Sequence, residues 1–447
     1  MKQNLYVFII VLLLYSSVSA EELRLQNAIE EALLHNHKQA ISLQERAIAQ
    51  AKYKASLSVN LPSLDILLVA NRRDEPLVDK TNTLFNIEGF GTFPVNYEHE
   101  VMGRDTLSAK AQLSYALYTG GKASAYQAMA KSALAYTKEE ASLTAETIVL
   151  NVRKYYAALL LAQKLETLMQ KSVEKMRLIA ELTELFYKGA SLKVKKTDYL
   201  HVKTTLLNME SLLLSFENAT ELARDALCLE MGRDAECSVD VLEESLDLES
   251  KEASLQEYYE KLFIRNHQLK KSKIALDAQA AELQAAKSEY MPKVLLYADI
   301  ETLYNDGNGG IINGQNNDSW NIGAVVRYNL FNGGKSEAKL EELQAKKLKL
   351  KAQRAYLKSG LQLQAKRAYS GLQTAKRQVL VMREALKSAT QNSDLNMRAY
   401  QEELLETKDV LEAEFMRSLT AAALYKAEYT VRLKRAELDY VIGKALR

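Results

Sequence analysis

Histidines and cysteines are the side chains of this sequence whose spacing could support chemistry, and the pair His35-x-His37 comes first. Two histidines can share a metal ion, but positions two apart on a helix point to different faces, so their ring nitrogens do not converge. The other histidines, His99, His201 and His267, have no cysteine or acidic cluster at ligand spacing around them. We therefore expect no metal site and no cofactor.

A glycine-rich segment, 307–314 (GNGGIING), raises the question of a phosphate-binding loop. Such a loop needs a lysine followed by serine or threonine, and this segment lacks both. No arrangement of residues for catalysis is recognisable elsewhere in the sequence. We predict that the protein is not an enzyme.

Cys228 and Cys237 are the two cysteines, and they lie nine residues apart in the break between two helical regions. In an oxidising compartment they could close a small disulfide loop, and the alternative is a pair of unlinked thiols. Two cysteines without flanking histidines do not make a zinc site.

The N-terminus indicates that the protein is exported. Lys2 precedes an apolar run from Tyr6 to Tyr15, and small residues end at Ala20, which is the pattern of a cleaved signal peptide over 1–20. No later stretch reaches the roughly 20 consecutive apolar residues of a membrane-spanning helix. The 59 basic and 57 acidic residues nearly balance, so we do not expect nucleic acid as a partner.

An internal duplication organises the rest of the chain. LSYALYTGGK at 113–122 corresponds to VRYNLFNGGK at 326–335, Asn36-His37 corresponds to Asn266-His267, and Pro62 corresponds to Pro292. Each repeat is predicted to run helix, strand, loop, strand, long helix and return helix. The first repeat is expected over 21–230, with strands around 62–72 and 107–118, a long helix 122–188 and a return helix 192–230. A linker follows over 231–250, and the second repeat, over 251–447, is expected to have strands around 293–304 and 320–331, a long helix 335–401 and a return helix 405–443.

Alternating side chains support the strands. In 107–117 the odd positions form an apolar face, and in 320–330 the even positions from Ile322 to Leu330 do the same. The partner strands alternate less cleanly, and their side chains expected to face inward are Tyr297, Asp299 and Glu301. The connections, about 73–106 and 305–319, are rich in turn-forming residues and are expected to be exposed loops.

Such strands are typical of a membrane β-barrel with lipid outside and water inside, although a soluble sheet with one wet face shows the same alternation. Four strands of about ten residues can cross a bilayer but cannot close a barrel, and an open edge in lipid leaves backbone groups unsatisfied. Several chains must therefore share one barrel. Two copies give eight strands and a filled interior, and three give twelve strands and more room for a lumen.

The two long helices must lie in water because each is on the order of 100 Å long and carries charged faces. No proline occurs between Pro94 and Pro292, which favours uninterrupted helices. Leucine and alanine recur at helical spacing, so we expect coiled coils with the shorter return helices. The runs Leu25 to Ser56 and Leu255 to Glu289 have a length that fills the remaining part of each long helix. A soluble coiled-coil scaffold is the alternative, but it leaves the strands unexplained.

The sequence resembles the TolC family of outer-membrane efflux proteins over nearly the whole mature chain. The more specific motifs are Ala399-Tyr400, 407–413 (TKDVLEA) and 425–443, with first-repeat counterparts at 186–189 (FYKG) and 197–200 (TDYL). The resemblance implies a mostly helical fold with a membrane β-barrel, in which a trimer forms a twelve-stranded barrel continued by a long α-helical barrel. It implies coiled-coil tips that close like an iris and bind an adaptor.

By this resemblance Tyr400, Asp409 and Glu412 belong to the periplasmic gate, with Asp198 on the neighbouring hairpin. Symmetry copies of each carboxylate near one axis repel unless cations or basic side chains bridge them. The family often has a glycine and an arginine where this chain has Glu403 and Leu405. We hypothesise that basic tip residues partly replace that arginine, namely Lys193, Lys195 and Lys196. The alternative is that these lysines are solvated and contact the adaptor.

The resemblance also predicts partners and location. The adaptor-contact tips are expected at Gly189, Ala190, Glu403 and Leu404. The expected partners are two further copies of the chain, outer-membrane lipid, a periplasmic adaptor (membrane fusion) protein and an inner-membrane pump of the RND, ABC or MFS type. The protein is predicted to lie in the outer membrane of a Gram-negative cell and to extend into the periplasm. Tripartite efflux is the favoured function, with a type I protein-secretion duct and a coiled-coil adhesin as alternatives.

Overall fold

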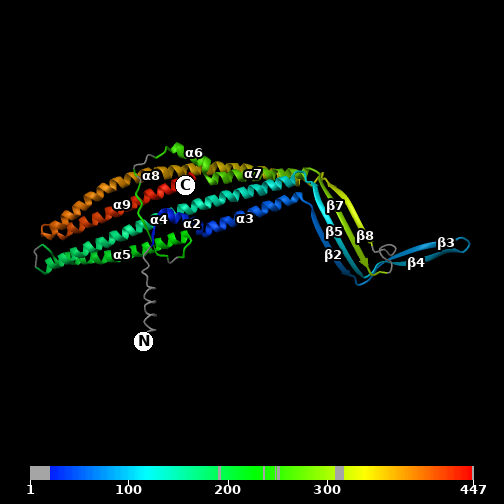
Figure 1. Ribbon diagram of the computed structural model, residues 1–447, viewed down its shortest axis with the longest axis horizontal. Coiled ribbons are helices and arrows are strands. Elements are labelled where there is room, and N and C mark those ends of the chain that lie inside the picture. Colours follow the sequence, from blue (N-terminus) through cyan, green and yellow to red (C-terminus); the bar gives the residue numbers. More distant parts are fainter. Residues whose placement is uncertain are drawn as a thin grey trace, which may run out of the picture. The chain divides into compact units, whose positions relative to one another are not determined.

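The computed structural model describes residues 21–189, 193–234, 237–246, 248, 252–307 and 317–444 (Figure 1). The predicted signal peptide, 1–20, lies outside these residues, as does most of the glycine-rich segment. Within the described ranges no helix is both long enough and apolar enough to cross a membrane. The chain divides into two compact units. We call the unit containing Thr137–Lys273 and Gln353–Arg447 the helical unit, and the unit formed by Ala47–Tyr136 and Ile274–Ala352 the sheet unit.

The sheet unit contains a four-stranded antiparallel sheet in the order β2-β5-β7-β8. Its strands are β2 (Ser63–Arg72), β5 (Asp105–Tyr118), β7 (Lys293–Asn305) and β8 (Asn317–Arg327). Each repeat contributes two strands, and the two repeats meet between β5 and β7. The strands β2 and β8 stand at the two edges.

The register of this sheet separates an apolar face from a polar face. One row of paired residues runs Asp65, Gln112, Asp299 and Asn321, and the next runs Leu64, Leu113, Ala298 and Ile322. Because neighbouring rows point to opposite sides of a sheet, Tyr297, Asp299 and Glu301 share the polar side with Lys110. This is the side on which the sequence pattern placed them.

Both repeats enter the sheet in the same way. The helices α3 (His37–Leu57) and α7 (His267–Lys287) each continue into a 3-10 turn, η1 (Ser58–Asn60) and η2 (Ser288–Tyr290). Leu61 and Met291 then adopt extended backbone, with ψ of 151° and 148°. A residue before proline is excluded from the helical region, so Pro62 and Pro292 end the helices at equivalent points.

The connection 73–106 is not a loop as expected but a long hairpin, β3 (Leu77–Ile87) and β4 (Gly91–Met102). Its turn contains Gly89 and Gly91, with φ of 89° and 96°, a conformation that glycine adopts without strain. Some of the turn-forming residues that suggested a loop lie at the ends of the hairpin, but Asn82, Pro94 and Asn96 lie within its paired strands. The strand expected over 320–331 is also shifted, because β8 ends at Arg327, opposite the first residue of β7.

The helical unit contains two long helices and their return helices. The long helices are α4 (Lys122–Lys188) and α8 (Lys335–Gln401), whose first turns belong to the sheet unit, and they cover the residues of the predicted long helices. The return helices are α5 (Lys196–Met231) and α9 (Thr407–Val441), slightly shorter than expected. The strand β1 (Glu21–Leu23) pairs in parallel with β6 (Val239–Val241) of the linker.

Two equivalent hydrophobic cores stabilise the helical unit. In the first, Ile29 of α2 (Leu25–His35) packs with Ile148 of α4 and Leu227 of α5. In the second, Leu262 of α6 (Leu255–Arg265) packs with Leu372 of α8 and Leu438 of α9. The runs expected to be single helices are therefore each broken in two. The breaks fall at Asn36 and Asn266, for a reason given below.

Candidate functional site: the helical tips and the repeat junctions

The turn between α8 and α9 is tight and has one strained residue. Glu403 has a φ of 56°, which is unusual for a side chain other than glycine, asparagine or aspartate. Its backbone N–H donates to the Tyr400 carbonyl at 3.0 Å, and the Leu404 N–H donates to the Ala399 carbonyl at 2.8 Å. Leu404 is 70% exposed, so this turn presents an apolar side chain to solvent.

Tyr400, predicted to belong to the gate, is buried at the tip with 1% exposure. Its hydroxyl lies 2.7 Å from Thr183 Oγ1 of α4 and 3.1 Å from Thr407 Oγ1 of α9. Thr183 already donates to the Ile179 carbonyl at 2.6 Å, so the Tyr400 hydroxyl donates to Thr183 and accepts from Thr407. One buried chain of hydrogen bonds thus ties the second tip to α4 of the first.

Apolar packing surrounds that chain. The Phe186 ring meets the Tyr400 ring edge to face at 5.7 Å between centroids. Met176, Ile179, Val202 and Val410 complete a buried cluster with Tyr400. Sequence reasoning missed Thr183, and it gave Thr407 only as part of the motif 407–413, because a threonine in a helix has no distinguishing pattern unless its partner across the interface is known.

The predicted basic partners lie at the first tip. Lys193 donates from Nζ to the Glu403 backbone carbonyl, a second link between the two tips. Asp198 accepts from the Lys195 backbone N–H at 2.8 Å and thereby caps α5, which begins at Lys196. The carboxylate of Asp198, which the resemblance assigned to the gate, thus also stabilises the start of α5. Gly189 ends α4 with an N–H bond of 2.8 Å to the Leu185 carbonyl, whereas Ala190 lies outside the described residues.

The remaining gate candidates, Asp409 and Glu412, are exposed and lie three residues apart near the start of α9. That spacing places both carboxylates on one helix face. Deeper along α9, Glu414 is nearly buried and is held by Arg417 and by Ser393 Oγ at 2.7 Å. Desolvation alone would raise the pKa of Glu414, but the hydrogen bonds from Arg417 and Ser393 outweigh it and lower the pKa.

Asn36 and Asn266 form equivalent junctions between helices. Asn36 Nδ2 donates to the Glu230 carbonyl at 2.7 Å, and its Oδ1 accepts from the Lys38 N–H at 2.8 Å. Asn266 makes a similar pair of bonds, to the Val441 carbonyl at 2.9 Å and from the Leu269 N–H, three residues on and not two, at 3.1 Å. Each asparagine side chain therefore donates to a carbonyl at the end of a return helix (α5 or α9). It also accepts from a backbone N–H at the start of the helix that follows the asparagine (α3 or α7).

A glycine completes each junction. Gly232 and Gly443 follow the return helices with φ of 84° and 71°. A Cβ at Gly232 would lie 2.5 Å from the His35 carbonyl oxygen, and a Cβ at Gly443 would lie 3.1 Å from Arg265. The sequence signal was present, since an Asn-His pair and a helix-ending glycine recur in both repeats, but it marked the duplication without revealing the contact.

His267 begins α7 at the second junction and faces two carboxylates of α4. Its Nδ1 lies 2.6 Å from Glu139 Oε2, and its Nε2 lies 3.8 Å from Glu146 Oε1. The sequence showed no acidic cluster near His267 because these partners are more than one hundred residues away along the chain. Burial raises the pKa of Glu146 to about 7, and Lys270 acts in the opposite direction. In the described part of the chain no group of three such side chains is placed to hold a metal ion.

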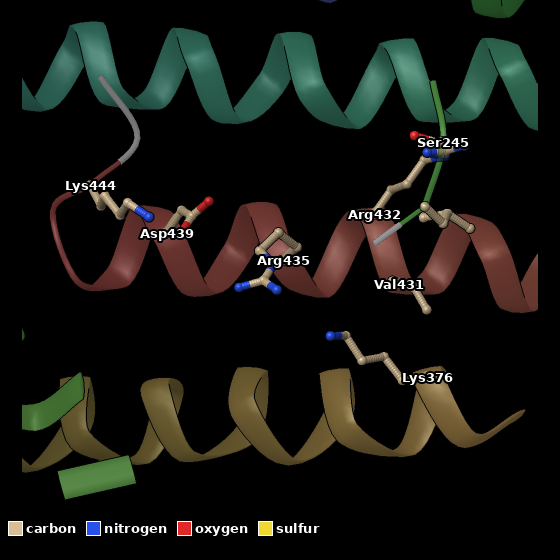
Figure 2. A pocket seen from close by; sticks show the side chains of 8 residues that line it. Ser245, Lys376, Val431, Arg432, Arg435, Asp439 and Lys444 are labelled. Atoms are coloured by element: carbon tan, nitrogen blue, oxygen red, sulfur yellow. The ribbon is translucent and has the colours of Figure 1, made fainter. Parts of the chain in front are cut away.

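A cavity of about 400 Å³ is lined by residues of α8, α9 and the segment at Ser245, and half of its lining residues are basic (Figure 2). Arg435 and Lys376 both pair with Glu252, Arg432 lies 3.7 Å from Glu243, and Asp439 binds Arg153 at 3.1 Å. These cations are largely neutralised by the protein's own acids. We therefore interpret the cluster as an anchor for the segment around Glu252 and not as an anion site.

The two cysteines are placed for a disulfide. Cys228 and Cys237 are joined, with their Cα atoms 6.2 Å apart, which is in the range that a disulfide spans. The bond connects the end of α5 to the segment that leads into β6. The second repeat has no counterpart to it.

Two kinds of comparison link this chain to known proteins: a match to the sequence model of one family, and matches of its fold to solved structures. The sequence model of the family described as "Outer membrane efflux protein" matches residues 258–444. No curated protein sequence matches the chain significantly. A membrane protein from Pseudomonas aeruginosa has a TM-score of 0.78 at 17% identity, covering 94% of this chain and 93% of that one.

Two outer-membrane proteins extend the likeness. VceC from Vibrio cholerae gives 0.74 at 19% identity, covering 94% of this chain and 96% of its own. The CmeC outer membrane channel from Campylobacter jejuni gives 0.78 at 14% identity, covering 94% and 86%. These matches confirm the predicted fold class of the chain and the resemblance to the family. The family is described as an outer membrane efflux protein, VceC as an outer membrane protein and CmeC as an outer membrane channel. These descriptions agree with the predicted outer-membrane location, and none of them names an enzyme.

Proposed function

We propose that this chain, which carries an outer membrane efflux protein domain in its second half and the fold of TolC-type channels, forms a trimeric export channel. Three copies supply twelve strands to one barrel in the outer membrane. The channel passes substrates from a periplasmic adaptor and an inner-membrane pump to the exterior. Tripartite efflux is the favoured assembly, and type I protein secretion is the alternative.

One observation carries this proposal, namely a sheet with an exposed apolar face and two open edges. Ile66, Trp320 and Ile322 on that face are 73%, 74% and 77% exposed. Exposed apolar surface on this scale, on strands of bilayer-crossing length, is suited to lipid. In lipid the open edges of β2 and β8 must pair with further strands, and other copies of the chain provide them.

The polar face of the sheet is suited to a water-filled lumen. Lys110 Nζ lies 3.1 Å from Asp299 Oδ1, and Asn321 Nδ2 donates to the same oxygen at 3.3 Å. Gly323 pairs with Tyr297 on the same face, and a Cβ at Gly323 would lie 2.7 Å from the Tyr297 ring. The charged groups of the polar face therefore form ion pairs and hydrogen bonds with neighbouring strands. None of these groups lies on the face proposed to contact lipid.

The tips are proposed as the gate. The exposed carboxylates of Asp409 and Glu412 come from each copy, so three pairs near one axis repel and favour cations between them. The contacts from Tyr400 to Thr183 and from Lys193 to Glu403 hold the two tips of one copy together and are proposed to keep the entrance narrow. The exposed tip residues around Gly189, Glu403 and Leu404 are proposed to bind the adaptor.

The lone tryptophan provides a direct test of the membrane assignment. Trp320 is the chain's single tryptophan and lies on the apolar face, so brominated lipids should quench its fluorescence in reconstituted protein. The same preparation should give a trimeric mass in detergent and steady conductance in planar bilayers. A monomer whose Trp320 emission is that of water-exposed indole would exclude the channel and leave the adhesin.

Closed-state leakage tests the lysine hypothesis. If Lys195 and Lys196 oppose the gate carboxylates, Lys195→Ala and Lys196→Ala raise the leakage of the closed channel, with Lys203→Ala on α5 as a matched control. Unchanged leakage argues instead for solvated, adaptor-contacting lysines. Crosslinking from cysteines at Gly189 and Glu403 identifies the partner, and a drug-type or a protein-type transporter in the product separates the two export functions.

A further inference from the structure

The hairpin of β3 and β4 has two chemically different faces. Paired residues share a face, so Thr83–Val95 and Phe85–Phe93 lie on one side, and Asn82–Asn96 lies on the other. We define the apolar hairpin face as Thr81, Thr83, Phe85, Ile87, Phe93, Val95 and Tyr97. We define the polar hairpin face as Lys80, Asn82, Asn86, Thr92, Asn96 and Glu98, which also contains the apolar pair Leu84–Pro94.

Nothing in the described part of the protomer covers the apolar hairpin face. Phe85 is 61% exposed, Phe93 49% and Tyr97 60%. Figure 1 shows β3 and β4 extending beyond the ends of β7 and β8. A two-stranded hairpin is only marginally stable in water unless another layer packs on it. The cover must therefore come from outside the protomer.

The base of this hairpin is fixed to the sheet. Asn305 Oδ1 at the end of β7 accepts from the Gly103 N–H at 2.6 Å, and Asp306 Oδ1 accepts from the Asp105 N–H at 2.8 Å. A Cβ at Gly103 would lie 2.2 Å from Asp306, so only glycine allows this approach. The orientation of the hairpin is therefore set by the sheet that carries it.

Two features indicate how a partner binds. Pro94 within β4 has no N–H to donate, which makes pairing along the outer edge of β4 unfavourable and directs a partner to the face. Four acidic residues and one lysine occur between Leu77 and Met102, and that lysine, Lys80, pairs with Glu98 at 2.9 Å. Binding to a membrane surface draws on basic side chains, so an acidic hairpin is poorly suited to it.

A second copy of the chain is the occupant that fits. The hairpin joins the end of β2 to the start of β5, and β2 is the edge strand that must pair with another copy if the proposed channel is correct. Three identical hairpins then emerge at one rim of the barrel, at the end of the sheet opposite its helices. We propose that the apolar hairpin faces of neighbouring copies pack on one another at this outer rim and narrow the mouth of the channel.

Single-cysteine variants test this proposal in the full-length protein. Thr83→Cys and Val95→Cys place a thiol on the apolar hairpin face, and Asn82→Cys and Asn96→Cys place one at the adjacent positions of the polar hairpin face. Oxidation or a short bismaleimide should link the first two variants into covalent dimers several-fold more efficiently than the second two. Equal or reversed yields in an intact trimer overturn the proposal.

A second measurement identifies a different occupant. In a Trp320→Phe background, Phe85→Trp reports the surroundings of the apolar hairpin face. We expect no quenching of Phe85→Trp by brominated lipid, whereas Trp320 in the unaltered protein is quenched. Strong quenching at Phe85→Trp assigns the face to the membrane and overturns the proposal while the channel stands. Failure to form any trimer, by contrast, rejects the proposed function itself.

Discussion

The two repeats use one scaffold but diverge where they meet. Asn36 and Asn266 each donate to a carbonyl at the end of a return helix and accept from a backbone N–H just after them, and a glycine closes each junction. Tyr187 and Tyr400 occupy equivalent positions in α4 and α8, yet Tyr187 is 38% exposed and stacks on Tyr199, whereas Tyr400 is buried between the tips. Positions that serve the fold have stayed alike, and positions at the interface between repeats have taken separate roles.

Other differences follow the same division. Glu146 of α4 is buried and faces His267, and the equivalent position of α8 is the exposed Ser359. Among the described residues, the hairpin β3–β4 has a place only in the first repeat, and the disulfide joins the end of that repeat to the linker. The duplication therefore provides a matched control for most substitutions, because each change in one repeat can be compared with its counterpart in the other.

The glycines of the junctions give the largest expected effect. Gly232→Ala combines a left-handed backbone with a clash against the His35 carbonyl and should lower the free energy of unfolding by about 4 kcal/mol. Gly443→Ala has the strain with a milder contact and should cost about 2 kcal/mol. Denaturant unfolding followed by circular dichroism measures both. Equal costs would show that the first junction relaxes around the new methyl group.

Glu146 should make stability depend on pH. Its pKa is about 7 in the folded protein against an ordinary value of 4.5, so between these values the unfolded carboxyl is ionised while the folded one keeps its proton. Stability from this group is complete below pH 4.5 and is lost as the pH rises to 7, by on the order of 3 kcal/mol. Glu146→Gln should remove this slope.

The control for that slope is Glu181→Gln, which changes an exposed carboxyl on the same helix. Denaturation midpoints from pH 4.5 to 8 should keep their full pH dependence in this variant. A slope that survives in Glu146→Gln would assign the proton to another group.

The junction asparagines should respond alike. Asn36→Ala and Asn266→Ala each remove a buried donor and acceptor, and each should cost about 2 kcal/mol in unfolding free energy. Asn36→Asp and Asn266→Asp keep the acceptor that caps the next helix and should lose less. If one alanine variant is silent, the equivalence of the two junctions is wrong.

The smallest effect is expected at the tips. Tyr400→Phe breaks the hydrogen-bond chain from Thr407 to Thr183 and should cost about 1 kcal/mol while raising closed-state conductance. Tyr187→Phe changes the equivalent tyrosine, which stacks on Tyr199 at the surface, and should leave conductance unchanged. Similar conductance in the two variants would contradict the link between Tyr400 and the gate.

Much of the architecture could be predicted because its causes are local or repeated. Side-chain alternation gave the faces of β5 and β8, the lack of proline gave the long helices, and the two GGK elements marked where those helices begin. The exposed loop expected over 73–106 was wrong because turn-forming residues also occur at the turn of a hairpin and, as with Asn82 and Asn96, within its exposed strands. The residue types alone did not show that 77–87 and 91–102 pair with each other as strands.

The sequence by itself determined the order, period and polarity of the elements, since these depend on neighbours within a few residues. Only the tertiary structure decided that Asn36 breaks a helix, that Tyr400 is buried and that His267 faces Glu139 and Glu146. Each of these depends on a hydrogen bond to a partner more than one hundred residues away. Such a partner has no periodic signature, and it becomes defined only when packing brings the two helices together.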